Sequence, residues 1–166
     1  GAGPALLDAL RRRYNFIVAD APYSGSSFHH ELLELSHQRV IVTLPTLVGI
    51  RDTLRLMALL PGAEQIQRAV VVLNRVGMPG GLHRKQVEEA LGMKADVVIP
   101  DQARQIAAAA TVGEPAVNTR GPFQTAIHEL ARQVAATDLL DAASGRGEAE
   151  APAPARGGWS LGRLFR

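Results

Sequence analysis

The chain has 166 residues, with 18 Lys and Arg against 16 Asp and Glu, and contains no cysteine. This length suits one domain with a real core, and a composition that is 46% apolar and 20% charged is typical of globular proteins. The lack of cysteine excludes a disulfide scaffold, a thiolate metal site and a cysteine nucleophile. No apolar run is long enough for a transmembrane helix, and the first residues lack a secretory signal pattern, so we expect a cytoplasmic setting.

The basic charge is concentrated at the end of the chain. Arg156, Arg163 and Arg166 lie in the last 11 residues, which contain no Asp or Glu. The preceding 155 residues are therefore close to neutral. They offer no broad basic surface for nucleic acid, which makes nucleic acid an unlikely partner.

Four short apolar runs alternate with helical patterns along the chain. The runs, at residues 16–19, 40–44, 69–73 and 97–99, are continuous rather than alternating, which predicts strands covered on both faces. Helices are predicted from the apolar spacing at residues 28–35, 47–57, 83–91 and from 122 onward, with a further helix after Asp101. Pro61-Gly62 is expected to stop the second of these helices and Gly92 to cap the third.

This alternation predicts an α/β doubly wound, mostly parallel sheet with helices on both faces. A domain of this class seldom opens with a helix that feeds directly into a central strand, so we expect the domain to be incomplete at its N-terminus. Residues 1–141 form the expected domain. Residues 142–158 are rich in Ala, Pro and Gly and predict a flexible linker, and residues 159–166 form a short basic, apolar tail.

The most informative segment is YNFIVADAPYSGSS at residues 14–27, in which an apolar run ends at Asp20. An acidic residue at the carboxyl end of a buried parallel strand lies where open α/β sheets bind ligands. In a P-loop fold this residue would be the Walker B acid, which holds Mg²⁺ directly or through water. An Asp that only caps the following turn is an equally good interpretation of this segment alone.

Three further segments continue the pattern: VVVLNRVGMPGG, VVIPDQARQIAAAATVGEPAV and TLPTLVGIRDTLRLM. They place Asn74 and Arg75 at one strand end, Pro100 and Asp101 at another, and an Arg-Asp pair on a helix. In this order and spacing the segments resemble the MinD/ParA group of deviant-Walker ATPases, and most of all the pilus-assembly members called CpaE or TadZ. The resemblance covers roughly residues 6–139 and implies a P-loop NTPase-like fold, ATP and Mg²⁺ as cofactors, and a homodimer that sandwiches ATP.

The resemblance also implies roles for the matching residues. Asp20 would meet the Mg²⁺, and Asn74, beside Arg75, would hydrogen-bond the adenine, because an amide offers a donor and an acceptor together. Pro100 and Asp101 would shape the loop beside the base. Arg51 and Asp52 match a pair near the dimer interface, where a structural ion pair is equally well supported. Asn15 replaces an Asp that is common before the Walker B strand.

The family's Gly-rich phosphate loop, with its signature lysines, has no match in this sequence. Backbone N–H groups and lysine charge are what hold a triphosphate. The only lysines are Lys85 and Lys94, and neither lies in a Gly-rich turn between a strand and a helix. By family order the loop would lie upstream of Gly1. We therefore expect no catalytic residue in this chain and no ATP hydrolysis by it alone.

The tail predicts a small amphipathic helix with Ser160 as its N-cap. Apolar residues gather on one side and arginines on the other, which is typical of a helix that binds a membrane interface with anionic lipid. The residues are Trp159, Leu161, Arg163, Leu164, Phe165 and Arg166. The tail resembles the C-terminal membrane-targeting helix of MinD-type proteins. An end that binds nothing, or that binds a protein partner, is the alternative.

Together these features predict part of a MinD/ParA-like ATPase that positions a type IVb (Tad/Flp) pilus secretion machine, whose components would be its partners, at the membrane or cell pole. A localisation scaffold of the same fold without catalysis is one alternative, and a missing lysine upstream would favour it. A DNA-partitioning ATPase is another. The near-neutral body argues against DNA binding, which depends on contacts from lysine and arginine to phosphate.

Overall fold

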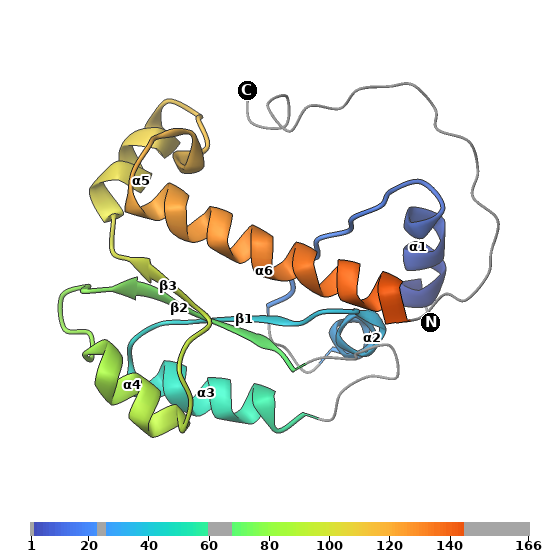
Figure 1. Ribbon diagram of the computed structural model, residues 1–166, viewed down its shortest axis with the longest axis horizontal. Helices are drawn as coiled ribbons and strands as arrows, with labels where there is room; N and C mark the ends of the chain where they lie inside the picture. Colours follow the sequence, from blue (N-terminus) through green and yellow to red (C-terminus); the bar gives the residue numbers. More distant parts are fainter. Residues whose placement is uncertain (1, 23–25, 60–67, 145–166) are drawn as a thin grey trace.

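The computed structural model describes residues 2–22, 26–59 and 68–144, which form a parallel sheet between two layers of helices (Figure 1). The strands are β1 (Val40–Thr43), β2 (Val70–Val76) and β3 (Val97–Pro100), in the order β1-β2-β3 with all pairs parallel. The helices are α1 (Ala2–Arg11), α2 (Ser27–Leu35), α3 (Leu47–Met57), α4 (Arg84–Leu91), α5 (Ala103–Thr111) and α6 (Pro122–Ser144), and a 3-10 turn covers Ala116–Asn118. The predicted α/β class is confirmed.

Local capping explains where the predicted helices begin and end. The Thr46 hydroxyl accepts a hydrogen bond from the Gly49 N–H at 3.0 Å and so starts α3, as Ser26 does for α2. Before α4, the Gln86 side chain accepts a hydrogen bond from the His83 N–H. Gly92 ends α4 with φ +69°, a left-handed conformation that glycine adopts without steric cost. The helices expected over residues 28–35, 47–57 and 83–91 are confirmed.

The two faces of β2 divide the core between the helical layers. Val71 and Leu73 pack with Ile50 of α3 and with Val87 and Leu91 of α4. On the opposite face, Val70 and Val72 of β2 and Val97 and Ile99 of β3 pack against α6 through Phe123, Ala126, Ile127 and Leu130. Val71, Val72 and Leu73 are completely buried. A strand buried on both faces must be apolar throughout, which is why this run does not alternate.

The strand expected at residues 16–19 is not formed, and this prediction was wrong. Residues 16–20 carry no strand assignment, and Phe16 is 65% and Val18 96% exposed. A strand depends on ladder hydrogen bonds to a neighbour, and the described residues supply no partner strand for this segment. Its apolar side chains are therefore left in contact with solvent.

β1 also departs from the expectation of two covered faces. Parallel partners in register share a face, so Ile41 lies with Val71 under the α3 and α4 layer, whereas Val42 lies with Val72 on the α6 side. Ile41 is buried, but Val42 is 59% exposed, because α6 covers β2 and β3 and not β1. β1 is an edge strand of the described sheet. We call the exposed Val40, Val42 and Leu44 the open β1 face.

Several expectations concern residues outside the described ranges. Pro61 and Gly62 belong to this group, and so does the whole tail: Trp159, Leu161, Arg163, Leu164, Phe165 and Arg166. Within the described part, α6 continues to Ser144, three residues into the stretch expected to be linker. Over residues 2–22, 26–59 and 68–144, no helix has the length and apolar character needed to cross a bilayer.

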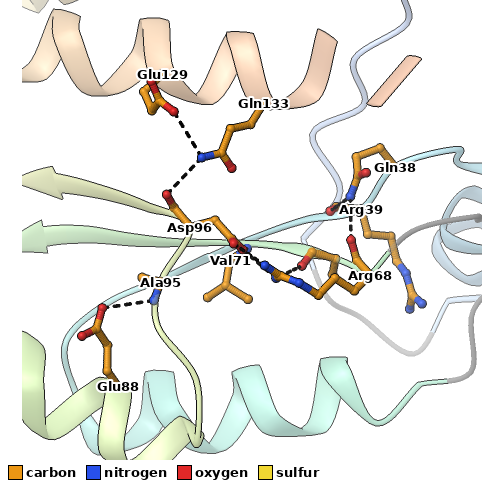
Figure 2. A network of polar contacts seen from close by, with 10 residues as sticks. Gln38, Arg39, Arg68, Val71, Glu88, Ala95, Asp96, Glu129 and Gln133 are labelled. Atoms are coloured by element: carbon orange, nitrogen blue, oxygen red, sulfur yellow. Dashed lines mark hydrogen bonds and ion pairs between the residues drawn. The ribbon is translucent and has the colours of Figure 1, made fainter. Parts of the chain in front are cut away.

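A polar cluster ties the start of β2 to the start of β3 and to α6 (Figure 2). The Asp96 carboxylate accepts hydrogen bonds from the Arg68 guanidinium and, at 2.8 Å, from the Val71 N–H. The Asp96 carbonyl accepts a third from the Gln133 side chain of α6 at 3.2 Å. Burial alone would raise the pKa of Asp96, but the hydrogen bonds from Arg68 and Val71 and the Arg68 charge hold it below its ordinary value.

We predict that Asp96→Asn lowers the free energy of unfolding at pH 7 by about 1–3 kcal/mol, because a part-buried carboxylate loses its charge-assisted hydrogen bonds. A carboxyl with a lowered pKa in the folded state stabilises the fold above its unfolded pKa, near 4. That contribution disappears as the pH falls through the folded value. The difference between wild type and variant should therefore shrink below about pH 4.

Urea unfolding followed by circular dichroism between pH 3 and pH 7 measures this effect. Asp52→Asn is the matched control, because Asp52 also carries a lowered pKa but is solvent-exposed, and it should change stability little. Equal losses in the two variants would contradict a special role for Asp96.

The loop between β1 and α3 is closely packed around Gly49. A Cβ added to Gly49 would lie 2.4 Å from the Leu44 carbonyl oxygen and 2.8 Å from the Thr43 hydroxyl. The same loop is joined to the loop after β2, since the Leu82 N–H donates to the Pro45 carbonyl at 2.8 Å. Gly49 therefore allows α3 to begin directly against the end of β1.

We predict that Gly49→Ala lowers the free energy of unfolding by about 1–3 kcal/mol, because the backbone of the loop must move away from the new methyl group. Val48→Ala, one residue earlier and 57% exposed, is the control and should have a much smaller effect. Guanidinium unfolding of both variants tests the prediction. Unchanged stability in Gly49→Ala would show that the loop tolerates the methyl group.

Candidate functional site

The candidate site lies where the strands end. Because β1, β2 and β3 are parallel, their carboxyl ends meet at one edge of the sheet, which is where open α/β sheets bind ligands. Asn74 and Arg75 are among the last three residues of β2, Pro100 is the last residue of β3, and Asp101 follows it. All four are partly exposed rather than buried. The structure therefore brings together four of the residues that the sequence singled out.

Two contacts join the end of β2 to the end of β3. The Asp101 N–H donates to the Val76 carbonyl at 2.9 Å, and the Arg75 Nε donates to the Asp101 carboxylate at 3.0 Å. The side chains of Arg75 and Asp101 are 42% and 16% exposed. The carboxylate of this ion pair is therefore largely shielded from water, whereas the guanidinium is not. Pro100 lies opposite Val76 in the strand register. These contacts fix the spacing of the two strand ends.

The side-chain carboxamide of Asn74 makes one hydrogen bond within the protein, through its oxygen. Its Oδ1 accepts a hydrogen bond from the Arg75 N–H at 2.9 Å. Within the described ranges the structure records no hydrogen bond from the Asn74 Nδ2. An amide held in this way can donate from Nδ2 and accept through the second lone pair of Oδ1. This donor and acceptor pair suits the edge of a nucleobase.

Asp20 is not connected to the residues at the ends of β2 and β3 by any recorded contact in the described ranges. It is exposed, it follows the extended segment 16–19, and no hydrogen bond or ion pair joins it to Asn74, Arg75 or Asp101 in the described part of the chain. The strand that was expected to carry Asp20 is the one that does not form. A role for Asp20 at Mg²⁺ stays a prediction.

Arg51 and Asp52 form a local pair on the surface of α3. The Arg51 Nε donates to the Asp52 carboxylate at 2.9 Å, and Arg55 lies 3.8 Å from the same carboxylate. The hydrogen bond to Asp52 raises the pKa of Arg51, and the hydrogen bond from Arg51 lowers the pKa of Asp52. Both side chains are about half exposed, so the pair adds little to stability. A role in a dimer interface stays a prediction.

Two features of the site have no clear signal in the sequence. One is the loop around Pro45 and Gly49, which lies beside the loop after β2. The other is the backbone of Arg75, the single non-glycine residue of the described ranges with a positive φ, at +57°. The sequence shows an arginine after an asparagine and does not reveal the conformation. The conformation lies in an irregular stretch of the pairing between β2 and β3.

Comparison with known proteins supports the fold. No protein-family model matches the chain. A protein of Emiliania huxleyi named as a septum site-determining MinD is 27% identical over 117 residues, which cover 68% of this chain and 42% of that protein. This chain therefore spans less than half the length of that relative.

Two solved structures have the same architecture. MinD of Pyrococcus horikoshii OT3, solved with Mg-ADP, superposes with a TM-score of 0.65 at 22% identity over 79% of this chain and 54% of that one. A ParA family ATPase of Chlorobium tepidum TLS superposes with a TM-score of 0.64 at 18% identity over 78% of this chain and 54% of the other. The parallel sheet, its two helical layers and these superpositions show that the chain has the fold of the MinD and ParA ATPases.

Proposed function

We propose that this chain forms the base-binding part of a MinD/ParA-like ATPase that uses ATP as a switch. The observation that supports the proposal most directly is the group formed by Asn74, Arg75, Pro100 and Asp101 at the carboxyl edge of a MinD-type sheet. The relative from Pyrococcus horikoshii was solved with Mg-ADP. An adenine nucleotide is the ligand that we infer for this edge.

The hydrogen-bonding groups at this edge of the sheet fit the base of an adenine nucleotide but do not fit its triphosphate. The Asn74 carboxamide offers a donor and an acceptor at the exposed end of β2. A triphosphate needs a Gly-rich loop of backbone N–H groups with a lysine, and this sequence contains no such loop. Bound Mg²⁺ would neutralise phosphate charge, and Asp20 is the carboxylate that we propose to meet it. This chain's own contribution is to bind and orient the base.

The open β1 face is consistent with a larger sheet. Val42 is 59% exposed, and β1 has no partner strand on its outer side in the described ranges. Exposed apolar side chains on an edge strand favour coverage by another segment. We propose that the phosphate loop and its strand, in a longer form of this protein, pack along β1. The chain matches only 42–54% of the length of the relatives described above.

The proposed cellular role is to position a type IVb pilus secretion machine as a homodimer. This part of the proposal rests on the likeness of the strand-end motifs to CpaE and TadZ. A localisation scaffold of the same fold that does not hydrolyse ATP is the competing function. The two differ in whether the natural protein binds Mg·ATP and hydrolyses it.

We predict that the protein expressed from the complete natural reading frame binds Mg·ATP and hydrolyses it slowly, whereas the 166-residue chain does not hydrolyse it. Asn74→Ala should weaken ATP binding about tenfold, because a buried base edge loses a bidentate partner. Isothermal titration calorimetry and a phosphate-release assay measure both effects. Asn118→Ala, at an exposed asparagine in the 3-10 turn, is the matched control.

No ATP binding by the complete protein would overturn the ATPase proposal and leave the scaffold function. Unchanged binding in Asn74→Ala would remove the base-binding role from this residue while leaving the ATPase proposal in place. An upstream sequence without a Gly-rich loop and lysine would also favour the scaffold.

We further propose that residues 159–166 bind anionic membranes. The complete protein should sediment with vesicles that contain phosphatidylglycerol and not with pure phosphatidylcholine, and added salt should weaken the binding. Leu164→Asp should abolish this binding by charging the apolar side of the tail. Gly157→Ser, in the expected linker, is the control. Vesicle binding that survives both Leu164→Asp and removal of the tail would contradict the proposal.

A further inference from the structure

Arg75 holds a backbone conformation that residues with side chains rarely adopt. Its φ is +57°, and it is the single non-glycine residue with a positive φ in the described part of the chain. For such a residue the left-handed region is sterically costly, because Cβ approaches the following carbonyl oxygen. Residues held in sparsely populated regions persist only where their surroundings fix them, and they gather at functional sites. The surroundings of Arg75 therefore need a physical explanation.

The strained residue lies in a β-bulge. Leu73 pairs with Val98 and Val76 pairs with Pro100, so two residues of β2 lie opposite a single residue of β3. The two residues are Asn74 and Arg75. A bulge breaks the alternation of side chains and redirects those next to it, and bulges occur often beside active sites.

Three contacts hold the bulge in place. The Arg75 Nε donates to the Asp101 carboxylate at 3.0 Å, and the Asp101 N–H donates to the Val76 carbonyl at 2.9 Å. The Arg75 carbonyl in turn accepts a hydrogen bond from the Met78 N–H at 3.1 Å. Asp101 thus contacts the end of β2 twice, at the Arg75 side chain and at the Val76 carbonyl. Its own side chain is only 16% exposed.

The bulge acts on the Asn74 side chain through the peptide group that joins Asn74 to Arg75, which lies inside the bulge. The N–H of the strained residue is the donor that Asn74 Oδ1 accepts at 2.9 Å. The orientation of this peptide group therefore holds Oδ1 at the Arg75 N–H and leaves Nδ2 at the other end of the carboxamide. If the bulge relaxed, the N–H would turn away and the carboxamide could rotate.

A fixed carboxamide distinguishes adenine from guanine. Adenine presents an amino donor beside the N7 acceptor, which matches an amide oxygen and an amide nitrogen, whereas guanine presents two acceptors. An amide that can turn is able to offer its nitrogen to guanine O6, and this weakens the discrimination. Holding the amide in one orientation is therefore a means of selecting the base.

We propose that the Arg75–Asp101 ion pair holds the β2 bulge in its strained form and so fixes the Asn74 carboxamide in the orientation that selects adenine over guanine. Arg75 and Asp101 are then positioning residues and not ligands of the nucleotide. The proposal rests on the proposed function, in which Asn74 meets the base. It goes further by naming the residues that determine base specificity.

The test compares the affinities of the complete natural protein for ATP and GTP, both carrying a fluorescent label on the ribose, in the presence of Mg²⁺. Wild type should prefer ATP. Arg75→Ala and Asp101→Asn should bind ATP about three- to tenfold more weakly and GTP nearly unchanged, so that the preference falls by the same factor. Arg75→Lys keeps a positive charge near Asp101 and should restore part of the preference.

The Arg75→Gly variant distinguishes the effect of the ion pair from the effect of the backbone strain. Glycine adopts a positive φ without cost, so this variant should fold and unfold at a temperature near that of wild type, yet lose the preference for ATP. Arg84→Ala is the matched control. It breaks an ion pair of similar exposure, between the Arg84 Nε and Glu88 at 2.8 Å, and should leave the preference unchanged.

Three results would overturn the proposal. The first is equal weakening of ATP and GTP binding in Arg75→Ala and Asp101→Asn, which would show a structural role alone. The second is full preference for ATP in Arg75→Gly, which would show that the ion pair is not needed. The third is a wild-type protein that binds no adenine nucleotide. This last result would remove the proposed function as well, and the wild-type measurement alone identifies it.

Discussion

The structure depends on the burial of β2. This strand pairs with β1 on one side and β3 on the other, and its residues Val71, Val72 and Leu73 have no exposed surface. Each helical layer packs against one of its faces, so both halves of the core meet on this strand. Burying a side chain the size of Leu or Val contributes about 1.5–3 kcal/mol. The positions of the other elements follow from packing against a strand that water cannot reach.

The two ends of β2 use polar groups for different purposes. At its start, Asp96 accepts hydrogen bonds from Arg68 and Val71 and joins the sheet to α6 through Gln133, which stabilises the fold (Figure 2). At its other end the strand becomes polar at Asn74, and the bulge leaves this side chain partly exposed. The contacts that stabilise the fold lie at one end, and the proposed ligand site lies at the other. Open parallel sheets place their ligands at the carboxyl ends of the strands, which is consistent with this division.

β1 shows what the described chain leaves uncovered. Its buried side chains, Ile41 and Thr43, face α3 and α4, while Val42 on the other side is largely exposed. The apolar segment 16–19 is likewise exposed and unpaired in the described residues. Both segments have the composition of buried strands. In both segments the sequence predicts more burial than the structure shows.

Much of the site could be predicted from the sequence because it depends on position along the chain. Polar residues that directly follow apolar strands must lie at one edge of a parallel sheet, so Asn74, Pro100 and Asp101 could be grouped without coordinates. The ion pair between Arg75 and Asp101 could not. These residues are 26 positions apart, and their contact depends on the register of β2 against β3.

The sequence by itself determined the helices and the three strands that form, because apolar spacing, caps such as Thr46 and stops such as Gly92 act within a few residues. Only the tertiary structure decided whether an apolar run becomes a strand, since residues 16–19 match the composition of β2 but lack a partner among the described residues. It also decided the bulge at Arg75 and the role of Asp96. Hydrogen bonds between strands and between distant side chains set these features, and their geometry is not present in any local stretch of sequence.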